Sequence, residues 1–152
     1  MASPPRLIFL LNSAQRRLQQ WMASLQGDLS GQGSAPTPAH SGVLFMLDKN
    51  DGATMGELAL GLDLGPSAMS GLIQRMEALG WVRRQPCPLD ARTQRVWLQG
   101  DGRQQLPALY EALKRINQSL KSGFTDEELQ TVARWLRHVQ HIQNAPHGDS
   151  TP

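Results

Sequence analysis

The stretch LALGLDLGPSAMSGLIQRMEALGWVRR, from Leu58 to Arg84, decides the fold. Just before it, Thr54 and Glu57 form a T-x-x-E capping box, which opens a short helix. Residues 63–65 make a brief connection, and a second helix is predicted from Pro66 to about Leu79. The pattern therefore predicts two short helices joined by a tight turn.

The second of these helices has two unlike faces. Its apolar residues share one helical stripe and are predicted to be buried: Met69, Leu72, Ile73 and Met76. The opposite face is small and polar, with Ser67, Ala68, Ser70, Gly71, Gln74 and Arg75. A helix that enters the DNA major groove needs such side chains near its start, because bulky apolar groups would keep it from the base edges. An ordinary solvated helix surface has the same composition, so the flanking segments must decide between the two.

A β hairpin is predicted directly after this helix. Residues 81–84 and 95–98 are rich in aromatic and β-branched types, which favour strands. Two prolines between them disfavour both a helix and a central strand, so a long loop is expected at the tip. This loop carries Asp90 and Arg92. A helix-turn-helix followed by a hairpin is a winged helix-turn-helix.

The chain in front of this central unit is predicted to form two helices. Residues 6–26 place apolar side chains three and four positions apart, as an amphipathic helix does. A linker rich in Gly and Ser follows over residues 27–35. Thr37 is then the expected N-cap of a helix that has Pro38 in its first position and runs through Leu47.

Two amphipathic helices are also expected behind the hairpin. The first has an apolar stripe over residues 106–120 and tolerates Pro107 only within its first turn. The second opens at another capping box, formed by Thr125 and Glu128. Together with residues 6–26, these stripes exceed what one small winged helix can cover. They favour burial against a second copy in a homodimer.

Positive charge is concentrated in the central unit. The chain of 152 residues has a net charge of only +2. Residues 75–103 hold six arginines, no lysine and three acidic residues, which gives +3, whereas nine basic and ten acidic residues elsewhere give −1. The planar guanidinium group suits phosphates and base edges. This distribution favours a nucleic-acid partner more than the total charge does.

These segments resemble the MarR family of bacterial winged-helix regulators. The likeness covers about Thr37 to Gly102 and rests on TPAHSGVLFML, on the stretch quoted first, on the triplet Asp90-Ala91-Arg92 and on Leu98. It implies a mainly α-helical protein with a small β hairpin, acting as a repressor that binds palindromic double-stranded DNA as a homodimer. The recognition helices of such a dimer lie roughly 34 Å apart, about one DNA turn.

The resemblance divides the chain into four parts. Residues 1–35 would hold an N-terminal dimerisation helix and linker, and residues 36–100 the DNA-binding lobe. Residues 101–143 would form C-terminal dimerisation helices, and residues 144–152 a disordered tail. The chain departs from the family pattern at Gly71, where many relatives have a larger polar residue, and at Gln99, where Thr is usual.

The resemblance also assigns roles to individual residues. Arg92 at the wing tip is implied to reach the minor groove, and Asp90 to orient it, with a forked pair between carboxylate and guanidinium as the expected geometry. The arginines of the hairpin stem would contact phosphates. The predicted DNA-binding residues are Ser67, Ala68, Ser70, Gly71, Gln74, Arg75, Arg83, Arg84, Asp90, Arg92 and Arg95.

A ligand site is a further expectation from the resemblance, because this family often forms a cleft for small aromatic or phenolic anions. The candidate residues are Trp21, His40, Phe45 and Met46. A place in the core explains the same four residues and is the simpler interpretation. A small-molecule effector that prefers one spacing of the lobes would weaken DNA binding by shifting populations.

Other functions are disfavoured by the sequence. It contains no motif of a catalytic triad, P-loop or dinucleotide site, so no enzyme and no cofactor is expected. His138 and His141 lack further ligands nearby, so no metal site is expected. The single cysteine, Cys87, does not match the first-helix position of redox-sensing relatives. Without a leader or a membrane-length apolar run, a cytoplasmic protein is expected. The main alternative is a winged helix that binds proteins and reads no DNA.

Overall fold

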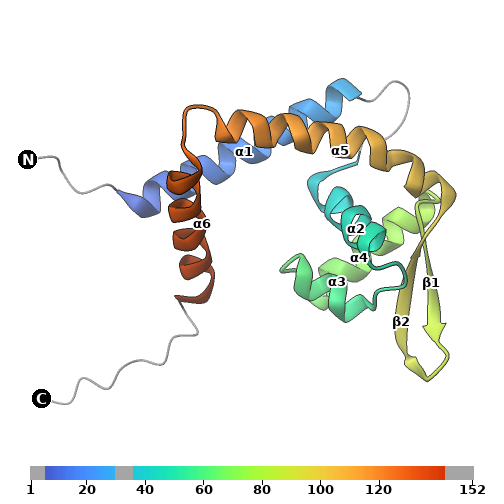
Figure 1. The fold of residues 1–152 in the computed structure, drawn as a ribbon. Coiled ribbons are helices and arrows are strands. Elements are labelled where there is room, and N and C mark those ends of the chain that lie inside the picture. Colours follow the sequence, from blue (N-terminus) through green and yellow to red (C-terminus); the bar gives the residue numbers. More distant parts are fainter. Residues whose placement is uncertain (1–5, 30–35, 143–152) are drawn as a thin grey trace, which may run out of the picture. The chain divides into compact units, whose positions relative to one another are not determined.

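The computed structural model describes residues 6–29 and 36–142, except for the side chains of residues 25–29, and divides into two compact units. The first unit ends at Leu113, within the fifth helix, and the second begins at Lys114. The elements are α1 (Leu7–Leu29), α2 (Pro38–Lys49), α3 (Met55–Gly61), α4 (Pro66–Ala78), β1 (Val82–Cys87), β2 (Asp90–Leu98), α5 (Gly100–Lys121) and α6 (Asp126–His141) (Figure 1). The predicted mainly helical fold with one antiparallel hairpin is confirmed.

Helix α1 continues to Leu29, three residues into the predicted linker, because a single glycine lowers helix stability by only about 1 kcal/mol. The predicted disordered tail, residues 144–152, lies outside the described residues, as does most of the linker.

Side-chain caps fix where α2 and α3 begin. The Thr54 hydroxyl accepts the Glu57 N–H at 3.1 Å, and the Glu57 carboxylate accepts the Thr54 N–H at 2.7 Å. These bonds to Thr54 lower the pKa of Glu57 and confirm the predicted capping box. At α2 the corresponding residue is a histidine, since Nδ1 of His40 accepts the Thr37 N–H at 3.1 Å. The side chain of His40 is thereby fixed at the start of α2.

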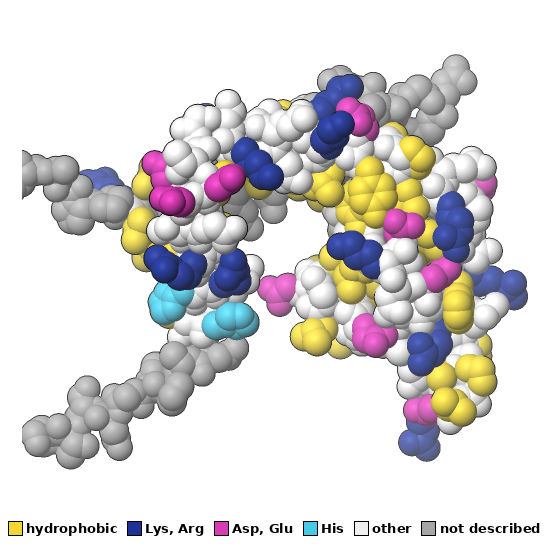
Figure 2. Space-filling model, viewed as in Figure 1, with side chains coloured by type: hydrophobic (Ala, Val, Ile, Leu, Met, Phe, Trp, Pro, Cys, Tyr) yellow, Lys and Arg dark blue, Asp and Glu magenta, His cyan; other side chains and the backbone are white. Residues whose placement is uncertain are grey.

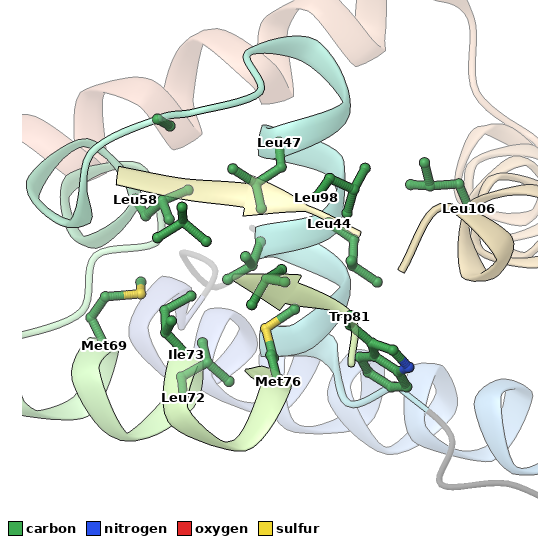
Figure 3. Close-up of a cluster of buried hydrophobic side chains, with 14 of the residues drawn as sticks. Leu44, Leu47, Leu58, Met69, Leu72, Ile73, Met76, Trp81, Leu98 and Leu106 are labelled. Carbon is green, nitrogen blue, oxygen red and sulfur yellow. The ribbon is translucent and has the colours of Figure 1, made fainter. Parts of the chain in front are cut away.

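The core lies among α2, α3, α4, the hairpin and the start of α5. In Figure 3, side chains from α4 point towards the strands and α2, where they meet Leu44 and Leu47. The predicted stripe of α4 is confirmed, because none of its four residues is more than 3% exposed: Met69, Leu72, Ile73 and Met76. This burial fixes which face of α4 is left for solvent or a partner.

The hairpin is longer than predicted, and the expected long loop is wrong. Val82 pairs with Leu98 at the base, and the strands continue until Cys87 pairs with Asp90, so only Pro88 and another residue form the turn. Pro86 is accommodated because each strand of a two-stranded ribbon has an open edge, where a missing N–H costs no ladder bond. The register shifts directly after this proline.

The connection between α2 and α3 runs along the hairpin and anchors it. The Gly52 N–H donates to the Val96 carbonyl at 3.0 Å, and the Val96 N–H donates to the Ala53 carbonyl at 2.9 Å. Gly52 has a φ of +81°, and a Cβ atom there would lie 2.6 Å from the Trp97 ring. The position therefore requires glycine both for its backbone conformation and for the close approach of Trp97.

Pro107 is not in the first turn of α5, contrary to the expectation, because this helix already begins at Gly100. The helix continues through the proline because Leu106 and Leu109 on either side are buried in the core. Burying two leucines contributes about 3–6 kcal/mol, which offsets the roughly 3 kcal/mol that a proline costs inside a helix.

Helix α6, in the second unit, has the predicted cap but no core of its own. The Thr125 N–H donates to the Glu128 carboxylate at 2.8 Å, and the Glu128 N–H donates to the Thr125 hydroxyl at 3.3 Å. None of its residues is buried. Its apolar stripe is therefore at least partly exposed.

Candidate nucleic-acid interface

Helix α4 presents the small polar face that its sequence predicts. Ser67, Ala68, Ser70, Gln74 and Arg75 are all exposed, and Gly71 is half-buried. A Cβ atom at Gly71 would lie 3.5 Å from the Arg75 guanidinium, so this side chain lies along the helix over the glycine. The face is therefore shallow, with two long polar side chains near its end.

The tip of the hairpin is braced by Asp90, but not in the predicted way. Its Oδ1 accepts the backbone N–H of Arg92 at 3.0 Å, and its Oδ2 accepts the hydroxyl of Thr93 at 3.1 Å. The predicted fork between this carboxylate and the Arg92 guanidinium is thus absent. An aspartate at a turn readily accepts the N–H two residues on, which is the shorter reach.

Arg92 itself is exposed, and no ion pair involving it occurs within residues 6–29 and 36–142. Its backbone is fixed by Asp90, while its guanidinium is left for an external partner. The tip therefore combines a fixed main chain with an available cation. Figure 2 shows basic, acidic and hydrophobic side chains gathered at this end of the hairpin.

Arg84 on the stem is bound to Glu77 at the end of α4. Its backbone N–H, Nε and Nη2 donate to the Glu77 carboxylate at 2.8, 2.9 and 2.8 Å. Burial raises the pKa of Glu77, but the hydrogen bonds from Arg84 outweigh it and the pKa is lowered. This pair ties the hairpin to α4.

Arg95 is also used inside the fold. Its Nη1 donates to the Gly52 carbonyl at 2.8 Å, and its Nε lies 3.5 Å from the sulfur of Cys87, which is buried. Hydrogen bonding from Arg95 is the main cause that lowers the pKa of the Cys87 thiol. Arg95 and Cys87 thus hold the strands to each other and to the chain before α3.

A third brace joins the hairpin to α5. The Asp51 carboxylate accepts the Leu98 N–H at 2.8 Å and forms an ion pair of 2.6 Å with Arg103. Three of the six clustered arginines therefore have internal partners. The other three, Arg75, Arg83 and Arg92, are exposed, and the described part of the chain offers them no ion pair.

The carboxylates of Glu77 and Asp51 were not among the predicted site residues, although they decide which arginines remain available. Glu77 lies seven residues from Arg84, and Asp51 lies 52 residues from Arg103. The only signal in the sequence was the presence of a few acidic residues around an arginine cluster, and that signal does not specify the pairs.

The four ligand candidates have different neighbours. His40 packs edge-to-face against Trp81, with ring centroids 5.4 Å apart. Phe45 packs against Tyr110 with tilted rings whose centroids are 4.9 Å apart, and Met46 lies against Gly61. Trp21 is half-buried on α1. These contacts fit the core interpretation of the four residues, and the ligand site stays a prediction.

His40 is chemically the most distinctive of the four. It is 7% exposed, and its Nε2 has no hydrogen-bond partner among the described residues. Burial lowers its pKa, and the nearby charge of Arg75 lowers it further, so the ring is held neutral. Because Nδ1 accepts the Thr37 N–H, the proton of the neutral ring lies on Nε2. Nε2 of His40 is therefore a buried donor that has no partner among the described residues.

The described residues include neither a cluster of metal ligands nor a membrane span. Across the described ranges, no three His, Cys, Asp or Glu side chains are grouped as metal ligands would be. His138 and His141 lie exposed on α6. No described helix has both the length and the apolar character needed to cross a bilayer.

The central part of the sequence is similar to known proteins. Residues 36–93 match the MarR family. A putative transcriptional regulatory protein for the hcr operon of Thauera aromatica is 25% identical over 103 residues, covering 68% of this chain and 62% of that protein. The HTH-type transcriptional repressor IacR of Pseudomonas putida is 26% identical over 99 residues, covering 65% and 59%. The match thus spans about three fifths of each curated relative.

Solved structures share the fold over most of the chain. The transcriptional regulator SlyA has a TM-score of 0.78 at 17% identity, covering 91% of this chain and 94% of its own. The repressor CouR, bound to a 23-mer DNA duplex, has a TM-score of 0.76 at 22% identity, covering 88% and 92%. BpsR of Bordetella bronchiseptica, whose DNA binding is regulated by 6-hydroxynicotinic acid, has a TM-score of 0.67 at 22% identity, covering 86% and 98%.

The family match covers α2, α3, α4 and most of the hairpin, and the shared fold extends to the helices on both sides. The residues that position the exposed arginines lie within the same region. Residues 36–93 are thus similar to the MarR family, and the chain shares the fold of solved transcriptional regulators over most of its length.

Proposed function

We propose that this chain is a homodimeric repressor that binds near-palindromic double-stranded DNA through α4 and the β1–β2 hairpin. The observation that carries the proposal is the division among the clustered arginines. Arg84 and Arg95 brace the hairpin, whereas Arg92 has an exposed guanidinium on a tip whose main chain is fixed. Some of the clustered arginines therefore stabilise the fold, whereas others remain exposed and can bind a polyanion.

In this proposal α4 enters the major groove. Its first turns carry only short side chains on the exposed face, so the helix backbone can approach the base edges closely. Gln74 and Arg75 reach further, and their amide and guanidinium groups suit adenine and guanine edges, respectively. Gly71 leaves room in which the Arg75 side chain lies.

The hairpin would follow the DNA backbone and place Arg92 in the minor groove. A narrow A·T-rich minor groove has an enhanced negative potential that attracts a guanidinium. Because Asp90 already fixes the backbone at Arg92, binding would order only the side chain, which lowers the entropic cost. Arg83 is exposed on the stem and would contact phosphates, with Arg84 and Arg95 adding charge nearby.

Dimerisation is supported by apolar side chains that this chain leaves exposed. On α1 these include Ile8, which is 80% exposed, and Phe9, and on α6 they include Val132 and Leu136. A two-fold axis would bury each such surface twice and would set two α4 helices about one DNA turn apart, roughly 34 Å. A near-palindromic operator in bacterial cytoplasm is the matching target.

The proposal also includes a small-molecule effector that binds near His40. The buried Nε2 donor of His40 would suit a carboxylate or phenolate of a small aromatic anion. The related fold of BpsR responds to 6-hydroxynicotinic acid, an aromatic acid. A ligand that binds better to a DNA-incompetent arrangement would release the duplex by linkage. Titration calorimetry with aromatic acids, comparing the wild type with His40→Phe, tests this part.

The main test is Arg92→Ala, measured by fluorescence anisotropy on a duplex from the region upstream of the gene. Loss of one minor-groove guanidinium should weaken binding by about 1–3 kcal/mol and make the salt dependence shallower by about one charge. The control is Arg137→Ala, which removes another exposed arginine, on α6 rather than on the hairpin, and should leave affinity within about twofold.

If Arg92→Ala binds every duplex as the wild type does, α4 and the hairpin do not grip DNA as proposed. The chain would then be better explained as a winged helix that binds proteins. If light scattering finds a monomer at micromolar concentration, the dimeric part fails independently.

A further inference from the structure

Leu89, at the tip of the hairpin, is an exposed apolar side chain that neither the core nor dimerisation explains. Leu89 is 95% exposed, more than any other large hydrophobic residue in the described ranges. Most other exposed hydrophobic residues lie on α1, α5 and α6, the helices proposed to pair with a second copy. Leu89 instead lies in the two-residue turn that ends the hairpin.

The position of Leu89 is fixed by its neighbours. Pro88 precedes it and restricts the backbone, while the following residue, Asp90, binds the main chain at Arg92 and the hydroxyl of Thr93. Cys87 and Asp90 are paired across the base of the turn, so Leu89 lies at its apex. Because the main chain of this turn is braced, binding would restrict little more than the Leu89 side chain, which limits the entropic cost.

Leu89 and Arg92 share this tip, so a groove that receives one lies within reach of the other. The basic, acidic and hydrophobic side chains at the end of the hairpin in Figure 2 make up this tip. Proteins that bind the minor groove often insert apolar side chains between base pairs and partly unstack them. Such insertion is cheapest at flexible pyrimidine–purine steps.

We infer that Leu89 enters the minor groove beside Arg92 as an apolar wedge, so that the wing selects deformable base steps. This inference rests on the proposed function. The two side chains make different demands, because the guanidinium favours A·T-rich DNA and the wedge favours a flexible step. A run of alternating T and A satisfies both, whereas an uninterrupted A-tract is stiff and satisfies only the first.

The test compares two duplexes of about thirty base pairs, long enough for two half-sites. One is an alternating T·A duplex and the other a pure A-tract, so both have the same base composition. Full-length wild type should bind the alternating duplex about tenfold more tightly in fluorescence anisotropy. Leu89→Ser should reduce this preference to about twofold or less, with an unchanged salt slope, because no phosphate contact is lost.

Two control variants separate the wedge from general effects. Leu89→Met keeps an apolar side chain at the tip and should retain the preference. Leu60→Ser removes another strongly exposed leucine, 86% exposed on α3, and should change neither affinity. A 2-aminopurine at a TA step of the alternating duplex should brighten when the wild type unstacks it, and should stay dark with Leu89→Ser.

The outcomes distinguish this inference from the proposed function. If Leu89→Ser keeps the full preference while Arg92→Ala weakens binding, the wedge is wrong and the DNA-binding function stands. If the wild type binds both duplexes equally and 2-aminopurine does not respond, the wedge is also wrong. If the wild type binds no duplex at low salt, both the wedge and the function are wrong, and Leu89 is better explained as a contact for a protein.

Discussion

Helices α4 and α6 have apolar stripes of the same helical spacing, but among the described residues the stripe of α4 is buried and that of α6 is not. Leu72 on α4 is 3% exposed, whereas Leu136 and Val132 on α6 are 39% and 49% exposed. The difference shows that an amphipathic pattern specifies a face to be covered but not what covers it. In α4 the cover is the core of the first unit, which leaves the polar face for a ligand. In α6 the stripe itself is what remains available.

The largest effect on stability is expected when a buried side chain of the α4 stripe is shortened. Ile73→Ala removes a fully buried side chain and leaves a cavity, so the free energy of unfolding should fall by about 2–5 kcal/mol. Urea denaturation followed by tryptophan fluorescence measures this fall. The fall should be the same at low and high protein concentration. A loss below about 1 kcal/mol would mean that the α4 stripe is not buried in the core.

A charge on the α6 stripe should act on assembly. Leu136→Glu places a carboxylate in a surface that a symmetric dimer buries twice, so self-association should weaken by roughly a hundredfold. Light scattering over a concentration series measures the change. Gln130→Glu, on the same helix but off the stripe, is the matched control and should keep the mass of the wild type. If both variants stay dimeric, α6 is covered by something other than a second copy.

A smaller effect on stability is expected at the ion pair between Glu77 and Arg84, which ties α4 to the hairpin. Glu77→Gln keeps the shape of the side chain but removes the charge that binds Arg84, and should cost about 1 kcal/mol of stability because the pair is part-buried. The pKa of Glu77 is lowered in the folded state, so its contribution is present above the ordinary value of 4.5.

As the pH falls from 4.5 through the folded pKa, Glu77 becomes protonated and this contribution is lost. Unfolding of the wild type and of Glu77→Gln should therefore differ at pH 7 and converge in acid. Circular dichroism melts across this range measure the difference. A gap that stays constant with pH would show that the carboxylate charge is not the source of the stability.

The sequence predicted an interaction only where its partners lie close together along the chain. The buried face of α4 and the Thr54–Glu57 cap depend on residues three or four positions apart, and both were predicted. The Arg95 bond to Gly52 spans 43 residues, and no local pattern contains it. The stem arginines were therefore all assigned to DNA, although Arg84 and Arg95 have partners inside the fold.

The hairpin tip shows a different limit. Asp90 and Arg92 were correctly seen as neighbours, but the expected partner of the carboxylate was the guanidinium rather than the main-chain N–H. Both geometries satisfy an aspartate, and the sequence spacing permits both. Likewise Pro86 was predicted to lie in a loop, because the sequence does not reveal that a ribbon of only two strands leaves its edge open.

The bonds by which Asp51 joins the hairpin to α5 have a mechanical consequence. One carboxylate holds both the end of β2, through the Leu98 N–H, and the first turn of α5, through Arg103. Any tilt of α5 about its start would therefore carry the hairpin stem with it as a lever, and a small rotation at the base would become a larger displacement at the distant tip. Asp51 is one of the links between helix and wing, so Asp51→Asn should weaken this transmission while leaving every residue proposed to contact DNA unchanged.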